Sequence, residues 1–411
     1  MTNLRRIVAL ILVAGVFVLD GYDINAMALA APRLQQPLGL APDRFGWVFS
    51  ALLIGLGAGS ALIGPLGDRF GRKPLIVLGC LGIALTAFGT ASATTLTGFF
   101  VWRLLTGLAL GAALPNCSAL SAELAPESKR ASVMVVVSAG ISGGALVAGW
   151  FTPPLVALGG WQAMFLAPGL FAALVAAGLF VALPKTAAPA VPAGKAAAPQ
   201  LELVRAPWLF PFAVFAIALT MNSANLYLLG QWLPTILPKA GFTLDQAARV
   251  SGISQGAGIL AGLAMSWLID NWRPGSTLFA VYSIATASLL LLALGIVGGT
   301  TGWTMLLIVA MGGVSGGGMA FPALTAYLFP SRLLSSAIGM GVLIARGGAI
   351  AAPLIGGALL TAGAGPATFL FAAVLPCAGC AAVSLALPKA LRVRELENPS
   401  RDGETAAAAG R

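Results

Sequence analysis

Two carboxylates near the N-terminus, Asp20 and Asp23, have the spacing and the surroundings for proton chemistry. They lie in the apolar string LDGYDINAM, and Asp20 follows Arg6 by 14 residues, which is about 20 Å of helix. That rise predicts a position near the middle of a membrane, and a spacing of three places both on one helix face. Because each carboxylate disfavours the charged form of the other, we expect at least one to hold a proton near neutral pH. The alternative is a pair that only bonds neighbouring helices.

Two arginines inside apolar stretches are the cationic counterparts. Arg103 begins RLLTGLALGAALPN, and Arg346 lies about a dozen residues into another stretch, in ARGGAIAAPLIGG. An arginine in a membrane span is costly unless it meets a carboxylate, a cavity or an anionic ligand. Arg346 is expected nearer the midplane and is the candidate for a substrate carboxylate, whereas Arg103 could partner an Asp of the first span. A salt bridge that only holds helices in register is the alternative for both. Glu123 is expected at the inner surface, paired with a basic loop residue.

The sequence offers few residues for catalysis or for metal binding. The chain has no His, which excludes a His-ligated metal site, and it has no recognisable nucleophile motif or cofactor site. Its four cysteines lie in apolar runs and are expected to be small packing residues; they are Cys80, Cys117, Cys377 and Cys380. We therefore expect neither an enzyme nor a protein with a bound metal or cofactor.

The elements that must position these residues are membrane-spanning helices. Of 411 residues 58% are hydrophobic and 9% are charged, against about 25% charged in a soluble domain, and the mean hydropathy is +0.94. Continuous apolar runs favour helices over a membrane barrel. Twelve runs predict an all-α membrane protein, at 7–31, 46–66, 74–93, 96–121, 131–156, 162–183, 207–237, 244–268, 275–297, 303–328, 334–361 and 366–388.

The distribution of Lys and Arg predicts the orientation in the membrane. With the N-terminus inside, seventeen of the 23 basic residues fall on the inner side; four fall outside, namely Arg33, Arg44, Lys239 and Arg249. This bias predicts that both termini are cytoplasmic. The basic residues on the cytoplasmic side also explain the net charge of +10. We therefore expect the lipid bilayer as a partner and no nucleic acid.

The chain divides into two related halves. A Pro- and Ala-rich linker at 184–206 separates a bundle at 1–183 from a second bundle at 207–388, followed by a cytoplasmic tail at 389–411. Asp20 and Asp23 map onto Asn222 and Asn225 at an offset of 202, and Asp68 maps onto Asp270 at the same offset. Such duplication is typical of transporters that rock around a central site.

Polar and aromatic residues in several stretches are the candidates for lining that site. The polar candidates are Asn116, Asn222, Asn225, Gln231, Ser254 and Gln255. The ring-bearing candidates are Tyr22, Trp47, Trp232, Phe321 and Tyr327. Aromatic residues also anchor helices at the membrane surface, so part of this second set could be interface anchors.

The string GPLGDRFGRKP, at 64–74, is the most specific local motif. It resembles the G-x-x-x-D-R-x-G-R-[RK] signature loop of the major facilitator superfamily. The resemblance implies a fold of twelve spans in two six-helix bundles. It also implies that the loop acts as a conformational latch, here through Gly64, Asp68, Arg69, Gly71 and Arg72, with Asp270 and Arg273 as the second-half counterpart.

Further strings make the chain similar to one branch of that superfamily, the aromatic acid:proton symporters. They are DGYD at 20–23, RLLTGLALGAALPNCSALSAELAP at 103–126, YLLGQWLPTIL at 227–237 and ARGGAIAAPLIGG at 345–357. The resemblance implies import of an aromatic carboxylate with protons across the bacterial inner membrane. It assigns function to Asp20, Asp23, Asp68, Arg72, Arg103, Glu123 and Arg346. The motif usually has Gly before the arginine, where this chain has Ala345.

Three readings of function follow. The leading one is a monomeric symporter working by alternating access, whose ring contacts come from Tyr22 or Phe321. The second is a proton-driven drug antiporter of the same fold, although the stretch at 138–155 lacks the G-P-x-x-G-G string typical of such antiporters. The third, a receptor that senses aromatic acids without moving them, has no signalling segment to support it.

Overall fold

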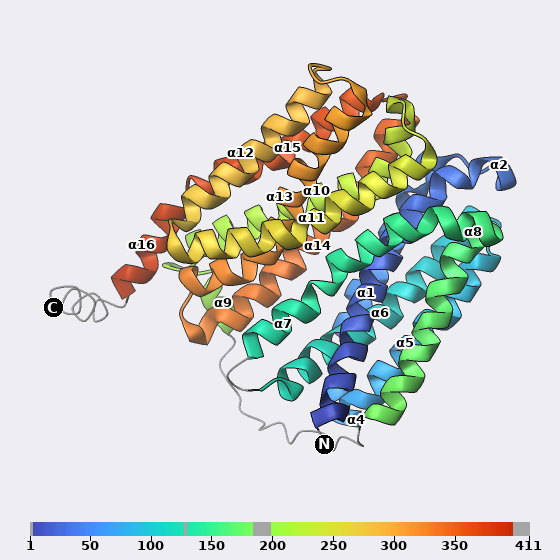
Figure 1. Ribbon diagram of the computed structural model, residues 1–411. Helices are drawn as coiled ribbons and strands as arrows, with labels where there is room; N and C mark the ends of the chain where they lie inside the picture. Colours follow the sequence, from blue (N-terminus) through green and yellow to red (C-terminus); the bar gives the residue numbers. More distant parts are fainter. Residues whose placement is uncertain (1–2, 127–129, 184–198, 398–411) are drawn as a thin grey trace.

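The fold is a bundle of long helices, as the apolar runs predict. The computed structural model describes residues 3–126, 130–183 and 199–397, and no strand occurs among them (Figure 1). The helices of the first half are α1 (Asn3–Ala30), α2 (Gln35–Leu38), α3 (Gly46–Leu62), α4 (Leu66–Phe70), α5 (Arg72–Ser92), α6 (Leu96–Leu124), α7 (Arg130–Ser138) and α8 (Gly140–Ala182). Those that follow are α9 (Pro199–Leu203), α10 (Leu209–Ile236), α11 (Leu244–Asn271), α12 (Pro274–Ala293), α13 (Gly299–Leu328), α14 (Ser331–Thr361), α15 (Pro366–Ser384) and α16 (Leu387–Glu397). Short 3-10 turns form η1 (Ala31–Arg33), η2 (Pro42–Phe45) and η4 (Leu237–Ala240).

Eleven segments of the described chain are long and apolar enough to cross a membrane. One of them, Val133–Ala182, has 50 residues and covers nearly all of two expected stretches, 131–156 and 162–183. Inside it Gly159 and Gly160 have non-helical backbone, and Gly160 has φ of +67°, a conformation that glycine adopts without a side-chain clash. Figure 1 shows α8 turning back at this point, so that its two arms run in different directions.

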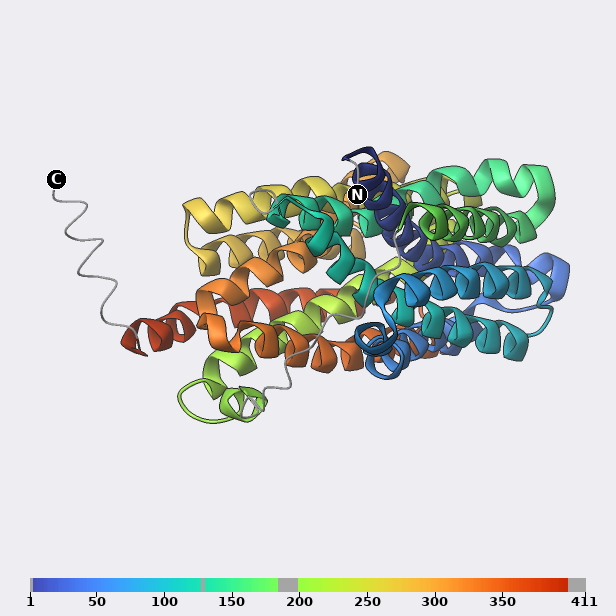
Figure 2. The same ribbon diagram turned by 90° about the horizontal axis from the view of Figure 1, so that it is seen from below.

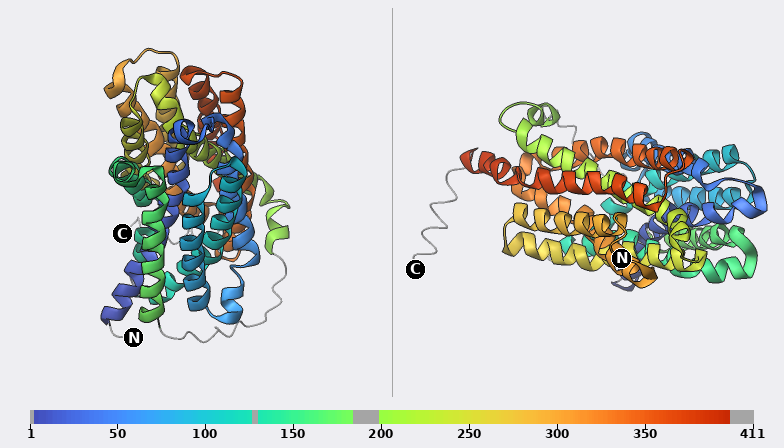
Figure 3. Two further views of the ribbon diagram at one scale, coloured as in Figure 1. Left: turned by 90° about the vertical axis from the view of Figure 1, so that its right-hand side faces the viewer. Right: turned by 90° about the horizontal axis from the view of Figure 1, so that it is seen from above.

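The long helices form two groups that follow the order of the chain. α1, α3, α5, α6 and α8 pack on one another, and α10 to α15 pack on one another. Figures 2 and 3 show the first group, blue to green, beside the second group, yellow-green to red. Contacts between the groups come from α1 with α10, α3 with α14 and α8 with α11. The linker expected at 184–206 lies outside the described residues up to 198, and α9 occupies part of the remainder.

Glycines allow backbone-to-backbone packing within the first half. A Cβ added to Gly55 of α3 would overlap the carbonyl oxygen of Leu104, and one added to Gly107 of α6 would overlap that of Leu52. Only a residue without a side chain fits at such a crossing, which is the small-residue packing common between membrane helices.

Candidate functional site

Asp23 and Arg103 form a buried ion pair between α1 and α6. Asp23 Oδ1 accepts a hydrogen bond from Arg103 Nη1 at 2.7 Å, and the Asp23 carbonyl oxygen accepts one from Nη2 at 2.8 Å. The Arg103 side chain is 1% exposed and that of Asp23 is 6% exposed. A charged pair removed from water needs this geometry, since neither charge has solvent to stabilise it. The structure thus brings Arg103 together with an Asp of the first span, one of the partners considered for it from the sequence.

Asp20 has a different environment one helical turn earlier. It is buried, and its Oδ1 atom has no hydrogen-bond partner among the described residues. Its carboxylate lies within electrostatic reach of Asp23, Arg346 and Arg103. Of the two acidic residues, Asp20 is therefore the one whose charge is not held by an ion pair in this structure.

Arg346 brings a positive charge to the same region from the second half. It lies on α14, is half-buried, and makes no hydrogen bond or ion pair with any residue that the structure describes. Besides Asp20, it lies within electrostatic reach of Tyr227 on α10. A carboxylate of the first half and a guanidinium of the second are thus near neighbours without a direct bond.

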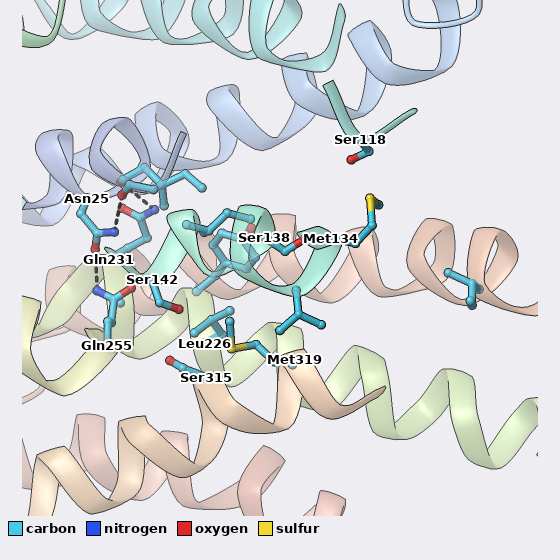
Figure 4. A pocket seen from close by; sticks show the side chains of 18 residues that line it. Asn25, Ser118, Met134, Ser138, Ser142, Leu226, Gln231, Gln255, Ser315 and Met319 are labelled. Carbon is cyan, nitrogen blue, oxygen red and sulfur yellow. Dashed lines mark hydrogen bonds between the residues drawn. The ribbon is translucent and has the colours of Figure 1, made fainter. Parts of the chain in front are cut away.

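A cavity of about 710 Å³ lies between the two halves (Figure 4). Its lining comes from α1, α6, α7 and α8 on one side and from α10, α11, α13 and α14 on the other. The lining residues are Gly21, Ile24, Asn25, Ser118, Met134, Val135, Ser138, Ile141, Ser142, Leu226, Tyr227, Gly230, Gln231, Gln255, Ser315, Gly318, Met319 and Ile338. None of these described lining residues is charged. A cavity of this volume, with a mainly apolar wall and a few polar groups, is typical of a site for a small organic ligand.

The cavity extends toward one end of the bundle only. Its lining runs from the second halves of α1 and α10 and the middle of α13 to Ser118 near the end of α6 and Ile338 near the start of α14. This is the end at which α1 begins. The cavity therefore opens away from the end at which α1 finishes.

At that opposite end the two halves are bonded to each other. Arg33 of η1 pairs with Asp245 of α11 at 2.9 Å, and Ser50 Oγ of α3 donates to the Ile350 carbonyl at 2.7 Å. Thr361 donates to Asp43 Oδ2 at 3.1 Å, and the rings of Phe49 and Trp232 lie 5.0 Å apart, edge to face. These contacts close the interface between the halves beyond the cavity.

Two glutamines that were expected to line a central site do line the cavity. Gln255 was a candidate for substrate binding, and Gln231 belongs to the wider set of polar candidates. The other expected substrate-binding residues are not among the lining residues. Arg346 makes no bond to a described residue, and the others contact protein. Tyr22 Oη donates to the Met164 carbonyl at 3.0 Å, and Trp232 Nε1 donates to that of Pro353 at 3.1 Å. Their roles in binding stay predictions.

The asparagines and the phenylalanine of that set are also engaged within the bundle. Asn116 Nδ2 donates to the Gly64 carbonyl at 3.0 Å, next to the signature loop. Asn222 Oδ1 accepts from Tyr282 Oη at 2.7 Å, Asn225 Nδ2 donates to Cys377 Sγ at 2.7 Å, and Phe321 packs edge to face on Phe215. The positions that correspond to Asp20 and Asp23 in the second half thus carry a neutral polar network.

The cavity includes residues that sequence reasoning missed, above all Asn25 and Tyr227. Asn25 is polar and follows Asp23 by two residues, so the rule that selected the other intramembrane amides would have found it. Ser138 and Ser142 flank the short break between α7 and α8 and gave no comparable signal.

The signature loop forms a compact turn between α3 and α5. α4 contains Asp68 and Arg69, both exposed, and Gly71 joins α4 to α5 with φ of +92°. Arg72 pairs with Glu123 of α6 and lies 3.8 Å from Asp68. The expected pairing of Glu123 with a basic loop residue is present.

The second-half counterpart of the loop is described only in part. The side chain of Asp270, near the end of α11, is outside the described part of the chain, and Arg273 is exposed at the start of α12. Latch function at both loops stays a prediction.

Comparison with known proteins identifies the family. The profile of the Major Facilitator Superfamily matches residues 12–329. A gallate transporter of Pseudomonas putida is 31% identical, with 84% of each chain covered. A 3-(3-hydroxy-phenyl)propionate transporter of Escherichia coli strain K12 is 32% identical, with 85% of this chain and 86% of the relative covered. A bacterial homologue of the lysosomal transporter Spinster, solved inward-facing and unoccupied, superposes with a TM-score of 0.71 at 15% identity, covering 96% of this chain and 97% of that one.

These matches agree with the expectation of a transporter rather than an enzyme, and of a multi-pass protein of the bacterial inner membrane. With its helical bundle, its central cavity and a profile match over most of its length, the chain belongs to the Major Facilitator Superfamily.

Proposed function

We propose that this protein imports an aromatic carboxylate together with protons by alternating access across the inner membrane. The substrate class is supported by the relatives, whose names include gallate, 4-hydroxybenzoate and 3-(3-hydroxy-phenyl)propionate transporters at 30–32% identity. The cavity supports it too, because its apolar wall suits an aromatic ring. Arg346 is the cation that attracts the carboxylate, since it has no bond to a described residue and lies near the cavity residue Tyr227.

The observation that carries proton coupling is the difference between the two acidic residues of α1. Asp23 is held as an ion pair by Arg103, whereas Asp20 has an unpartnered oxygen and lies near Arg346 of the other half. A buried carboxylate without an ion pair favours its neutral form, so Asp20 can take up and release a proton. A substrate carboxylate bound at Arg346 neutralises the positive charge that favours the ionised form of Asp20. Binding of the anion and protonation of Asp20 then support each other.

The conformational cycle follows from the two ends of the interface. The bonds at Arg33, Ser50 and Thr361 close one end, and the cavity opens toward the other. With the cytoplasmic N-terminus that the basic residues predict, this is an inward-facing state. Outward opening must break those bonds, while the loop that contains Asp68 and Arg72 makes new contacts with the second half on the inner side.

The proposed topology has twelve crossings and both termini in the cytoplasm. Division of α8 at Gly159 and Gly160 gives two arms, so each half contributes six spans. The halves are residues 1–183 and 207–388, joined by the linker at 184–206 and followed by the tail at 389–411. The transporter acts as a monomer, because the cavity is built from the two halves of one chain.

Uptake into proteoliposomes with an imposed proton gradient tests the proposal. Wild type is expected to accumulate labelled 4-hydroxybenzoate, and Asp20→Asn is expected to lose accumulation but to retain exchange of labelled for unlabelled acid. Glu202→Gln is the control, since it removes an exposed carboxylate of α9 that lies outside both the cavity and the closed end of the interface. Undiminished accumulation by Asp20→Asn refutes Asp20 as the proton carrier. Extrusion of a cationic dye, without accumulation of any acid, moves the function to drug efflux.

A further inference from the structure

Three amide side chains meet at one end of the cavity, and we call this group the amide corner: Asn25 of α1, Gln231 of α10 and Gln255 of α11. Figure 4 shows them together, with Ser118 and Met134 toward the other end. Gln255 Nε2 donates to Asn25 Oδ1 at 2.5 Å, and Gln231 Nε2 donates to the Ile24 carbonyl at 3.3 Å. Both bonds join the two halves of the protein.

Backbone carbonyls of α1 fix which way each amide points. Asn25 Nδ2 donates to the Gly21 carbonyl at 2.8 Å, and a carbonyl can only accept, so Asn25 must present its oxygen to Gln255. Gln255 must then use its NH2 group on that oxygen. By the same reasoning the Ile24 carbonyl requires the NH2 group of Gln231. The orientation of both glutamines therefore follows from the hydrogen-bond network.

Both glutamine oxygens are left as acceptors without a donor. Gln231 is 2% exposed, and its Oε1 atom is buried with no partner among the described residues. Gln255 is half-buried, and no described residue donates to its Oε1. Its amide lies next to Gly230, another lining residue, within 3.7 Å of the position that a Cβ would take there. A buried acceptor without a donor is unfavourable, so this end of the cavity is complementary to a ligand that donates a hydrogen bond.

The neighbouring wall narrows the chemistry of that ligand. Ile24, Ile141 and Leu226 supply apolar surface for a flat ring. A carboxylate would be repelled by the two amide oxygens, and the cation near the cavity is Arg346, beside Tyr227. An aromatic acid can bind with its carboxylate toward Arg346 and the opposite edge of its ring in the amide corner. A substituent on that edge then faces the two amide oxygens. A phenolic hydroxyl is the substituent that donates a hydrogen bond there.

We infer that Gln231 and Gln255 recognise a ring hydroxyl, so that the carrier selects hydroxylated aromatic acids over the unsubstituted acid. This inference rests on the proposed transport of aromatic carboxylates. A site whose buried polar groups are matched to a substrate hydroxyl discriminates against the analogue that lacks it, because the acceptors then stay unpaired. We expect about tenfold to hundredfold discrimination in transport efficiency, which corresponds to the cost of leaving a buried acceptor unpaired.

Wild type alone provides the first test, with benzoate, 4-hydroxybenzoate, 3-hydroxybenzoate and 4-methoxybenzoate as competitors of labelled 4-hydroxybenzoate uptake. At least one hydroxybenzoate should compete about tenfold or more better than benzoate. The methoxy acid should resemble benzoate, since it retains the oxygen but cannot donate. Equal competition by the methoxy and hydroxy acids overturns the inference and leaves the proposed function intact. Failure of wild type to accumulate any acid overturns both.

Variants test the residues. Gln231→Met and Gln255→Met should each reduce the preference for the hydroxy acid over benzoate by about tenfold, by lowering uptake of the hydroxy acid alone. A merely structural defect would lower uptake of both acids equally and leave the ratio unchanged, which overturns the assignment. Gln36→Leu makes a similar chemical change on exposed α2, outside the cavity, and should leave the ratio at the wild-type value.

Discussion

Replacement of Asp23 by Asn tests the ion pair with Arg103 most sharply. The change keeps the size of the side chain and one acceptor for Arg103 Nη1, but it removes the negative charge from a pair that is 1% and 6% exposed. Removing one partner of a buried pair costs about 3–5 kcal/mol, because the other charge is left uncompensated. Since Asn retains an acceptor, we expect the lower end, about 3 kcal/mol, which is more than a hundredfold in the ratio of folded to unfolded protein.

The two partners should not be equivalent. Arginine keeps its proton at every accessible pH, whereas an aspartate without its partner can become neutral by taking up a proton. Arg103→Gln should therefore destabilise less than Asp23→Asn. The double variant should be more stable than Asp23→Asn alone, because it leaves no buried charge at this position.

Equilibrium unfolding of the four proteins by SDS titration in mixed micelles measures these differences. The double-mutant cycle isolates the coupling between the two side chains, which we expect to be about 2 kcal/mol or more. Asp20→Asn is the control, since Asp20 has no ion pair to lose. Additive effects of the two single variants, with no coupling, would refute the reasoning.

Two further predictions concern packing and the closed end of the interface. Gly55→Ala should sharply reduce the yield of monodisperse protein in size-exclusion chromatography, because its Cβ would overlap the backbone of α6; Gly57→Ala, which meets open space on the same helix, should not. Reversing the charge of Arg33 or of Asp245 alone should shift the population toward the outward-open state by about fivefold. This is the effect expected from loss of a half-exposed ion pair that contributes about 1 kcal/mol. Reversing both charges should restore the wild-type population. Distances between spin labels on α2 and η4 measure the shift, and an unchanged distance distribution in both single variants contradicts a closing role.

The spans were predictable because the membrane imposes one requirement on every one of them. Lipid cannot satisfy backbone groups, so long apolar runs must be helices, and their positions follow from hydropathy. The break at Gly159 and Gly160 was visible as the gap between two runs. The pairing of Arg103 with an Asp of α1 followed from the cost of an isolated charge in a span.

The cavity-facing residues were harder to predict because the spans are apolar all round, so hydropathy does not show how each helix is rotated about its axis. On α10, Asn225 and Gln231 are six residues apart, which is about 240° of rotation, and they point to different neighbours. Asn225 bonds within its own half, whereas Gln231 lies at the cavity. Polar residue type alone does not separate these outcomes, since internal hydrogen bonds satisfy an amide as well as a ligand does.

The charges in the middle of the bundle have a consequence for the electrical behaviour of the carrier. Among the described residues, the buried charged side chains are Asp20, Asp23 and Arg103, and half-buried Arg346 lies close to them. With Asp20 ionised, two negative and two positive charges cancel. The empty carrier would then return across the membrane without moving net charge through the field, so voltage would have little influence on that step. Any dependence of uptake on voltage would belong to the loaded carrier, and it would report how many protons accompany each anion.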